Sequence, residues 1–219
     1  KDLLRIRYYT SHPKDMTNDL LEAHKECSKL MPLLHLPVQS GSDNILKTMN
    51  RKHTIKEYLE IVNTLKEKNP KIEFASDFII AYPGESDEDF NQTCKLMERI
   101  KFINSYSFIY SPRPGTPACD MTNVDSNTAK KRLEVFQKIA KKIKLNYKKH
   151  LINKVSKVLF ENRVKDGNDK YFGRDEYQNS VIVKSKKNII GSEKKVLIKK
   201  FSQQTIYGEL IHTDNFLAA

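Results

Sequence analysis

SDFIIAYPGESDEDF, residues 76–90, joins the end of an apolar run to a turn and then to the start of a helix. The apolar run Phe74–Ala81 predicts a buried strand. Pro83 and Gly84 predict the turn that follows it. Ser86 and the acidic residues up to Asp89 predict a capped helix N-terminus. The stretch is therefore a strand–turn–helix unit, the element from which parallel sheets are built.

The same alternation runs through residues 1–150. Further strands are predicted at Leu3–Tyr9, Leu33–Leu36 and Ser105–Tyr110. Helices are predicted from Thr17 to about Lys29, near 43–49, behind the Thr54–Glu57 capping box, from Ser86 onward, and in a long segment whose apolar stripe is Leu133, Phe136, Ala140, Ile143 and Tyr147. Four such units are too few to close a barrel. An open sheet is one reading, but we favour a piece of a larger barrel, because Lys1 leads directly into a strand and suggests a fragment.

The C-terminal part has a different pattern. Five short strands are predicted at 155–160, 170–173, 180–183, 195–200 and 205–210, with turns at Asp166–Asn168 and Ile190–Ser192. This spacing predicts a small Greek-key barrel of the OB type. Basic residues alternate with Tyr171, Phe172, Tyr177 and Phe201. These aromatic residues are either core or surfaces on which nucleic-acid bases stack.

The net charge of +12 is distributed unevenly. Residues 1–127 carry 17 Lys/Arg and 18 Asp/Glu, residues 128–150 carry 9 and 1, and residues 151–213 carry 13 and 7. The positive charge therefore belongs to the long helix and the predicted barrel, which indicates a polyanionic partner there. A lysine-rich genome would not leave the first 127 residues near neutral.

Several classes of protein and site are disfavoured. Cys27, Cys94 and Cys119 are far apart, without a CxxC or CxxxCxxC motif, so no metal site is predicted and free thiols in a reducing cytoplasm are expected. No apolar stretch approaches the roughly 18 residues of a membrane helix, so no membrane partner is expected. Gly41 and Gly84 lack the spacing of a phosphate loop.

Ligands of parallel barrels bind at the C-terminal ends of the strands. Four segments follow predicted strands there: 10–13, 37–43, 77–85 and 111–117. Gln39, Ser40 and Asp77 offer hydrogen bonds to a ribose or an amino-acid group, and Arg113 offers a planar cation. A nucleotide-like ligand is one reading of these segments, and ordinary loops are the other.

Four stretches resemble the MiaB-type methylthiotransferases, which are radical S-adenosylmethionine (SAM) enzymes: RIRYYTSHP (5–13), LHLPVQSGSDNILKTMNRKHT (34–54), SDFIIAYPGESDEDF (76–90) and SYSFIYSPRPGTPA (105–118). The C-terminal part resembles the TRAM domain, an OB-like RNA-binding module. The resemblance implies an α/β fold, the C-terminal portion of a radical SAM (partial TIM-like) barrel over residues 1–148, then a TRAM barrel over 149–213 and a tail over 214–219.

The resemblance also implies an activity, the addition of a 2-methylthio group to N6-isopentenyladenosine beside the tRNA anticodon. The alternatives are the branches that modify threonylcarbamoyl adenosine or a ribosomal-protein aspartate, and a non-catalytic RNA-binding fragment. The implied cofactors are SAM and two [4Fe-4S] clusters, whose cysteine ligands are not in this sequence. The chain alone is therefore expected to be inactive, with neither catalytic residues nor metal ligands. Expected partners are the tRNA anticodon arm, the missing N-terminal half of the enzyme and a reductant protein, in the cytoplasm.

The family's motifs assign roles by position. SAM-binding positions are Gln39, Ser40, Asp77, Tyr82, Pro83, Gly84 and Glu85. Ala81 departs from the glycine usual in this family, which weakens the assignment of the adenine contact. His12 and Arg113 lie at substrate positions, although His12 is equally consistent with capping a turn. The basic residues expected to contact RNA are Lys141, Lys142, Arg163 and Arg174.

The charge distribution predicts that residues 128–213 bind tRNA by themselves, with an affinity that falls steeply as the salt concentration rises. A salt titration of tRNA binding tests this prediction. Binding that is independent of salt, or binding by residues 1–127 alone, would contradict it.

Overall fold

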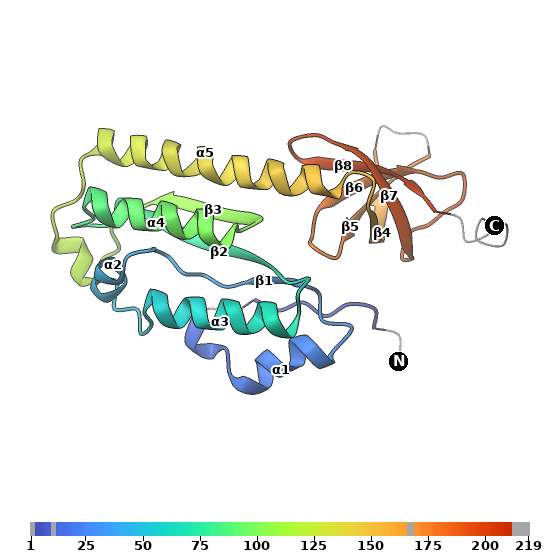
Figure 1. The fold of residues 1–219 in the computed structure, drawn as a ribbon. Helices are drawn as coiled ribbons and strands as arrows, with labels where there is room; N and C mark the ends of the chain where they lie inside the picture. Colours follow the sequence, from blue (N-terminus) through green and yellow to red (C-terminus); the bar gives the residue numbers. More distant parts are fainter. Residues whose placement is uncertain (1–2, 10–11, 166–168, 212–219) are drawn as a thin grey trace. The chain divides into compact units, whose positions relative to one another are not determined.

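The computed structural model describes residues 3–9, 12–165 and 169–211. They form two compact units with a boundary between Lys144 and Leu145 (Figure 1). The predictions made for Thr10 and Ser11, for the turn at 166–168 and for the tail at 214–219 lie outside the described residues. No described helix has the length and apolar character needed to cross a membrane.

The first unit alternates strands and helices in the predicted order. Its elements are the 3-10 helix η1 (Pro13–Asp15), α1 (Asn18–Glu26), β1 (Leu33–His35), α2 (Asp43–Thr48), α3 (Ile55–Lys68), β2 (Glu73–Ile80), α4 (Asp87–Ile100), β3 (Asn104–Ile109), η2 (Pro117–Asp120) and α5 (Ser126–Leu151), which continues into the second unit. The strands form a parallel sheet in the order β1-β2-β3. The predicted parallel βα architecture is confirmed.

Two capping boxes fix where α3 and α4 begin. Thr54 accepts a hydrogen bond from the Glu57 amide, and the Glu57 carboxylate accepts one from the Thr54 amide. Ser86 and Asp89 make the same reciprocal pair at the start of α4. Both boxes satisfy backbone donors that a helix leaves unpaired, so both helices start where the sequence predicts.

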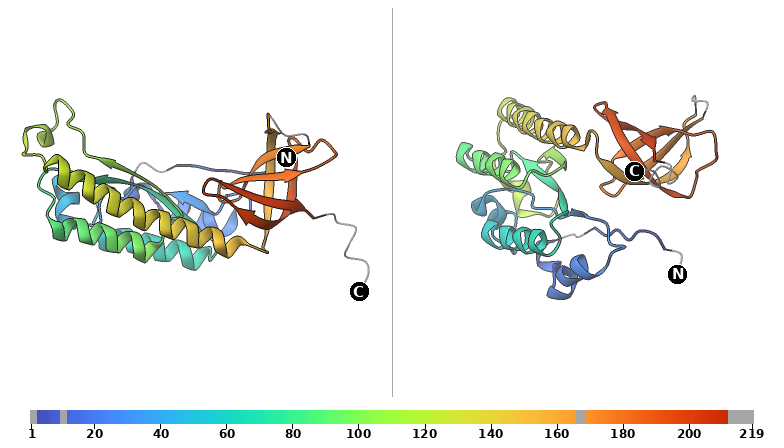
Figure 2. Two further views of the ribbon diagram at one scale, coloured as in Figure 1. Left: turned by 90° about the horizontal axis from the view of Figure 1, so that it is seen from above. Right: turned by 45° about the vertical axis from the view of Figure 1, so that its right-hand side comes forward.

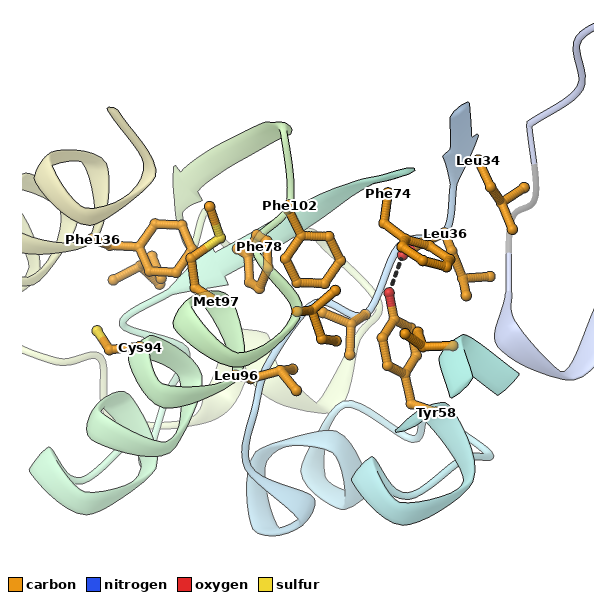
Figure 3. Close-up of a cluster of buried hydrophobic side chains, with 14 of the residues drawn as sticks. Leu34, Leu36, Tyr58, Phe74, Phe78, Cys94, Leu96, Met97, Phe102 and Phe136 are labelled. Carbon is orange, nitrogen blue, oxygen red and sulfur yellow. Dashed lines mark hydrogen bonds between the residues drawn. The ribbon is translucent and has the colours of Figure 1, made fainter. Parts of the chain in front are cut away.

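The core lies on one face of the sheet. Side chains of β2 alternate, and Phe74 and Phe78 point toward the helices. Figure 3 shows them in a row with Phe102 and with Phe136 of α5. The rings of Phe78 and Phe136 are 4.7 Å apart, measured between centroids. This cluster attaches the helices to the sheet, and Asp77 lies on the opposite face of β2.

The strand predicted at Leu3–Tyr9 is wrong as a continuous strand. Only Ile6 and Tyr9 make isolated parallel bridges, to Leu30 and His35 respectively. The alternating pattern is present, but no neighbouring described segment runs alongside it long enough to form a ladder. Leu3 and Tyr9 therefore remain exposed, at 58% and 68%.

The second unit is a closed five-stranded barrel, seen from two further directions in Figure 2. Its strands are β4 (Val155–Arg163), β5 (Lys170–Asp175), β6 (Ser180–Lys184), β7 (Glu193–Phe201) and β8 (Thr205–Leu210). They close in the order β4-β5-β6-β8-β7, with β6 and β8 parallel and all other pairs antiparallel. The predicted small barrel is confirmed.

Gly41 lies directly against the backbone of α4, where an added Cβ would come 2.5 Å from the Cα of Thr93. We expect Gly41→Ala to cost about 1–3 kcal/mol, because the helix must move. Gly115→Ala is the control: its φ is +81°, but nothing lies within 4 Å of the added Cβ. That substitution should cost only the backbone penalty, about 1 kcal/mol. Thermal unfolding measures both, and equal melting temperatures would contradict the close packing.

Candidate functional site

The C-terminal ends of β1, β2 and β3 meet at one edge, which we call the strand-end edge. The ladder is interrupted there by one extra residue on the side of Pro37: the Leu36 amide donates to the Ala75 carbonyl, and the next backbone amide to reach β2 is that of Gln39. The hydroxyl of Ser76 fills the gap, accepting from the Val38 amide at 3.0 Å and donating to the Leu36 carbonyl at 2.9 Å. Tyr58 donates to the same carbonyl at 2.8 Å (Figure 3). The interrupted strand is therefore held by buried side chains.

Gln39 rejoins the sheet beyond this interruption. Its amide donates to the Asp77 carbonyl at 3.0 Å, and its carbonyl accepts from Ile79 at 2.9 Å. Its φ of 72° lies in the left-handed region, which a non-glycine residue adopts only when the surroundings impose it. The structure thus brings the predicted Gln39 and Asp77 together on adjacent strands.

Asp77 points to the face of the sheet opposite Phe74 and Phe78, and its side chain is 31% exposed. One carboxylate oxygen, Oδ2, lies 3.2 Å from Nε2 of His35. The Arg51 guanidinium interacts electrostatically with Asp77. Burial lowers the pKa of Arg51, and the negative charge of Asp77 opposes that shift. Arg51 was not among the site residues predicted from the sequence. Its presence in the MNRKHT stretch was the available signal, but only the fold brings it to Asp77.

Ser40 lies at the same edge but faces inward. Its side chain is fully buried, with the hydroxyl 3.3 Å from that of Thr93 and accepting from the Ser42 amide at 3.2 Å. Thr93 also accepts from the Gly41 amide at 2.9 Å. In this arrangement Ser40 fixes the loop after β1, and its hydroxyl does not reach the open edge.

The turn after β2 contains the predicted residues Tyr82, Pro83, Gly84 and Glu85. Ala81 has a φ of 57°, the region that glycine favours, and its amide donates to Oε1 of Glu85 at 3.0 Å. The Ala81 methyl group is therefore accommodated in a backbone held by Glu85.

Arg132 of α5 holds this turn in place through hydrogen bonds to Glu85 and Asp87. Its Nη1 donates to both the carbonyl and Oε1 of Glu85, each at 2.9 Å, and its Nη2 donates to Asp87 at 2.6 Å. Burial raises the pKa of Glu85, while the Ala81 amide and Arg132 act in the opposite direction. The Glu85 side chain has no exposed surface, so it acts on a ligand only through the turn that it shapes.

Tyr82 and Tyr110 form an aromatic wall at this edge. Their ring centroids are 5.0 Å apart in an edge-to-face contact. They pack with an apolar cluster that includes Ile45 and Ala118. Burial, and then the neighbouring Tyr110, raise the pKa of Tyr82. Such a wall offers a flat apolar surface to a ring and displaces water from it.

The predicted substrate residues lie apart from these contacts. Nδ1 of His12 accepts from the Lys14 amide at 3.1 Å, which caps η1, and its ring meets His53 at 5.0 Å. This geometry matches the turn-capping alternative. Burial lowers the pKa of His53 to about 4, and the charges of His12 and Arg51 act in the same direction. Arg113 is exposed, and its carbonyl rather than its guanidinium holds the turn, accepting from Thr116.

The predicted RNA contacts are exposed basic residues. Lys141 and Lys142 lie on the surface of α5. In the barrel, Arg163 donates twice to the hydroxyl of Tyr171, at 2.9 and 2.8 Å. Arg174 lies over the Phe172 ring at 5.5 Å and 3.6 Å from Glu161. Both arginines therefore already have partners within the barrel.

Among the described residues, no three His, Cys, Asp or Glu side chains gather to hold a metal ion. Cys27, Cys94 and Cys119 are free thiols, and Cys94 is buried. Burial raises the pKa of the Cys94 thiol to about 11, so it remains protonated at neutral pH. These residues do not fit an iron–sulfur cluster.

Comparisons with known proteins agree with this architecture. Residues 1–97 match the Radical SAM superfamily. The tRNA-2-methylthio-N(6)-dimethylallyladenosine synthase of Pelagibacter ubique is 54% identical over 208 residues, which cover 95% of this chain and 46% of that protein. The synthases of Zymomonas mobilis and Rickettsia felis are 42% and 43% identical over 99% and 96% of this chain, and 48% and 47% of theirs. The chain spans about half the length of the curated relatives it matches.

A solved structure is similar in fold. Coproporphyrinogen III oxidase (HemN) from Escherichia coli, described as a radical SAM enzyme, superimposes with a TM-score of 0.53 and 13% identity. The match covers 90% of this chain and 46% of the other. At this identity the likeness concerns the fold alone.

The Arg132–Glu85 pair predicts a stability change that depends on pH. Arg132→Met leaves a buried carboxylate unpaired and should cost about 3–5 kcal/mol at pH 8. The penalty should shrink as the pH falls through the raised pKa of Glu85, because the protonated group carries no charge. Chemical denaturation at pH 8 and pH 5 measures this change. The double variant Arg132→Met/Glu85→Gln should recover part of the loss at pH 8, and a penalty equal at both pH values would contradict the account.

Proposed function

Because the chain belongs to the MiaB-type methylthiotransferase family of radical SAM proteins, we propose that it is the C-terminal part of an enzyme that adds a 2-methylthio group to N6-isopentenyladenosine in tRNA. The observation that carries the proposal is identity of 54% over 95% of the chain to a synthase named for that nucleoside. The Zymomonas mobilis and Rickettsia felis relatives carry the same name, which favours this branch over the threonylcarbamoyl and ribosomal-protein branches.

In this proposal SAM binds at the strand-end edge. Gln39 and Asp77 offer adjacent hydrogen-bonding groups, and Arg51 adds a cation suited to the carboxylate of an amino acid. The backbone of the Tyr82–Gly84 turn is available to an adenine or ribose, since Gly84 has a φ of +82° and no Cβ to block approach. The buried side chains of Ser40 and Glu85 do not contact the cofactor but hold the loop after β1 and the turn after β2 in place.

In this proposal the residues at the strand-end edge bind the cofactor and shield it from water, whereas the cofactor itself supplies the radical chemistry. SAM supplies the methyl group and, with an iron–sulfur cluster, the radical that attacks an unactivated aromatic C–H bond. The wall of Tyr82 and Tyr110 excludes water from this edge, and the Arg132–Glu85 pair keeps the turn rigid. The described residues do not fit either [4Fe-4S] cluster, so we assign the cluster ligands to a missing N-terminal half.

The remaining partners follow from the same proposal. A TRAM domain over residues 149–213 holds the anticodon arm of tRNA, and Lys141, Lys142, Arg163 and Arg174 attract its phosphates. His12 and Arg113 remain proposed substrate contacts, and the exposed side chain of Arg113 is accessible to RNA. A cytoplasmic reductant protein completes the system.

A chimera tests the proposed activity. This chain replaces the matching part of the Pelagibacter ubique relative, and the chimera is expressed in cells that lack the modification. Mass spectrometry of the tRNA nucleosides should show 2-methylthio-N6-isopentenyladenosine. Asp77→Asn should lower its yield at least about tenfold, because the loss of one charge-assisted hydrogen bond to the cofactor is worth roughly 1.5–3 kcal/mol.

Lys95→Gln serves as the control, since this exposed residue of α4 lies outside the strand-end edge. It should leave the yield unchanged. Methylthiolation of threonylcarbamoyl adenosine in place of the isopentenylated nucleoside would reject the proposed substrate, and full activity of Asp77→Asn would reject the proposed cofactor site.

A further inference from the structure

The outer face of β5, β6 and β8 carries an ordered row of side chains. Phe172 pairs with Ile182, Ile182 with Tyr207, and Tyr207 with Lys200 of β7. The neighbouring positions on these strands, such as Tyr171 and Ile206, are buried in the barrel. Since side chains alternate along a strand, the row points outward. Two aromatic rings therefore lie on one surface, each with a cation above it: Arg174 at 5.5 Å from Phe172 and Lys200 at 5.6 Å from Tyr207.

Two lysines face each other beside this row. Lys170 of β5 and Lys184 of β6 are direct cross-strand partners, and both are exposed. Like charges in this position destabilise a sheet. An anion bound between the two ammonium groups would relieve that repulsion. They line an open groove that also includes Tyr207 and Lys200.

A β-bulge adds further positive charge to the groove. Ile198 pairs with Gly208 and Lys200 with Tyr207, so Lys199 is an extra residue in β7. Both Lys199 and Lys200 are consequently exposed instead of one of them pointing inward. Lys199 lies 3.3 Å from Glu209, the one acidic side chain among the described residues that line this groove. That pairing neutralises Glu209 and leaves the other three lysines available.

We propose that this face, the β5–β6–β8 platform, binds single-stranded RNA, with a base stacked on Tyr207 and a phosphate held between Lys170 and Lys184. The inference rests on the proposed function for its RNA partner, and it assigns a surface that includes Arg174 but not Arg163. Paired bases have no free faces to stack on a side chain, whereas an unpaired strand presents both faces and phosphates. An acidic protein would satisfy the lysines but would not stack on the half-buried ring of Tyr207.

The charge part of the proposal is tested on the full 219-residue chain by fluorescence anisotropy with a labelled 12-nucleotide single-stranded RNA. Lys170→Ala/Lys184→Ala should reduce the slope of log affinity against log salt by about 0.7, the value for one phosphate contact in a single strand. The loss of this one phosphate contact predicts about fivefold weaker binding at 0.1 M salt.

The matched control is Lys194→Ala/Lys195→Ala. These exposed lysines of β7 lie outside the groove, and their removal changes the net charge by the same amount. This variant should lose less than about twofold in affinity, because these lysines do not line the groove and exposed charges are screened by salt. Equal losses in the two double variants would show general charge attraction and overturn the platform.

The stacking part is tested at Tyr207. Tyr207→Leu should weaken binding of the single strand about tenfold, the lower range for a lost base–aromatic contact, whereas Tyr207→Phe should bind like the wild type. Circular dichroism and thermal unfolding identify any variant that misfolds. If Tyr207→Leu misfolds, Tyr207→Phe keeps the test decisive. A loss of affinity in Tyr207→Phe matching that of Tyr207→Leu would overturn stacking.

Two further probes separate the proposals. A 12-base-pair RNA duplex or polyglutamate that binds as tightly as the single strand would overturn the platform's preference for unpaired RNA. Failure of the wild-type chain to bind any RNA would instead count against the RNA contacts in the proposed function. Normal wild-type binding that is unaffected by the groove variants would overturn the platform and leave the proposed function intact.

Discussion

The hydrogen bonds that Ser76 and Tyr58 make around Pro37 hold the strand-end edge in its shape. Without these bonds, the extra residue between Leu36 and Gln39 would separate the sheet there, and the Leu36 carbonyl would be buried with fewer partners. With these bonds, the chain returns to the sheet at Gln39, whose amide reaches the carbonyl of Asp77. The left-handed backbone of Gln39 is a consequence of this return. The proposed cofactor contacts thus depend on two buried hydroxyl groups that touch no ligand.

Local signals in the sequence were enough for much of the fold. The capping boxes at Thr54 and Ser86 fixed two helix starts, because they need only four neighbouring residues. Leu3–Tyr9 has the same alternation as a strand, but a strand also needs a partner along its length, which no local pattern reveals. Arg51 was missed for a similar reason: its closeness to Asp77 depends on the path of the chain through α2 and α3. The inward orientation of Ser40 depends on Thr93, 53 residues away in sequence.

The two units carry different physical properties. Residues 1–127 of the first unit are nearly neutral and form an edge of hydrogen-bonding and aromatic groups, which suits a small polar cofactor. The barrel has exposed lysines and half-buried aromatic rings on one face, which suits a flexible polyanion. Buried Lys148 donates to the carbonyls of Ser202 and Gln203, so the last turns of α5 are attached to the barrel loop between β7 and β8. A buried ammonium satisfied by carbonyls gives that loop a fixed position.

Amide hydrogen exchange with and without SAM, measured on the chimera with an N-terminal half, tests the central claim most directly. If the strand-end edge binds the cofactor, SAM should slow exchange in peptides covering residues 37–40 and 77–85, while peptides from the barrel stay unchanged. Slowed exchange elsewhere, with these two segments unaffected, would contradict the assignment of the cofactor to this edge.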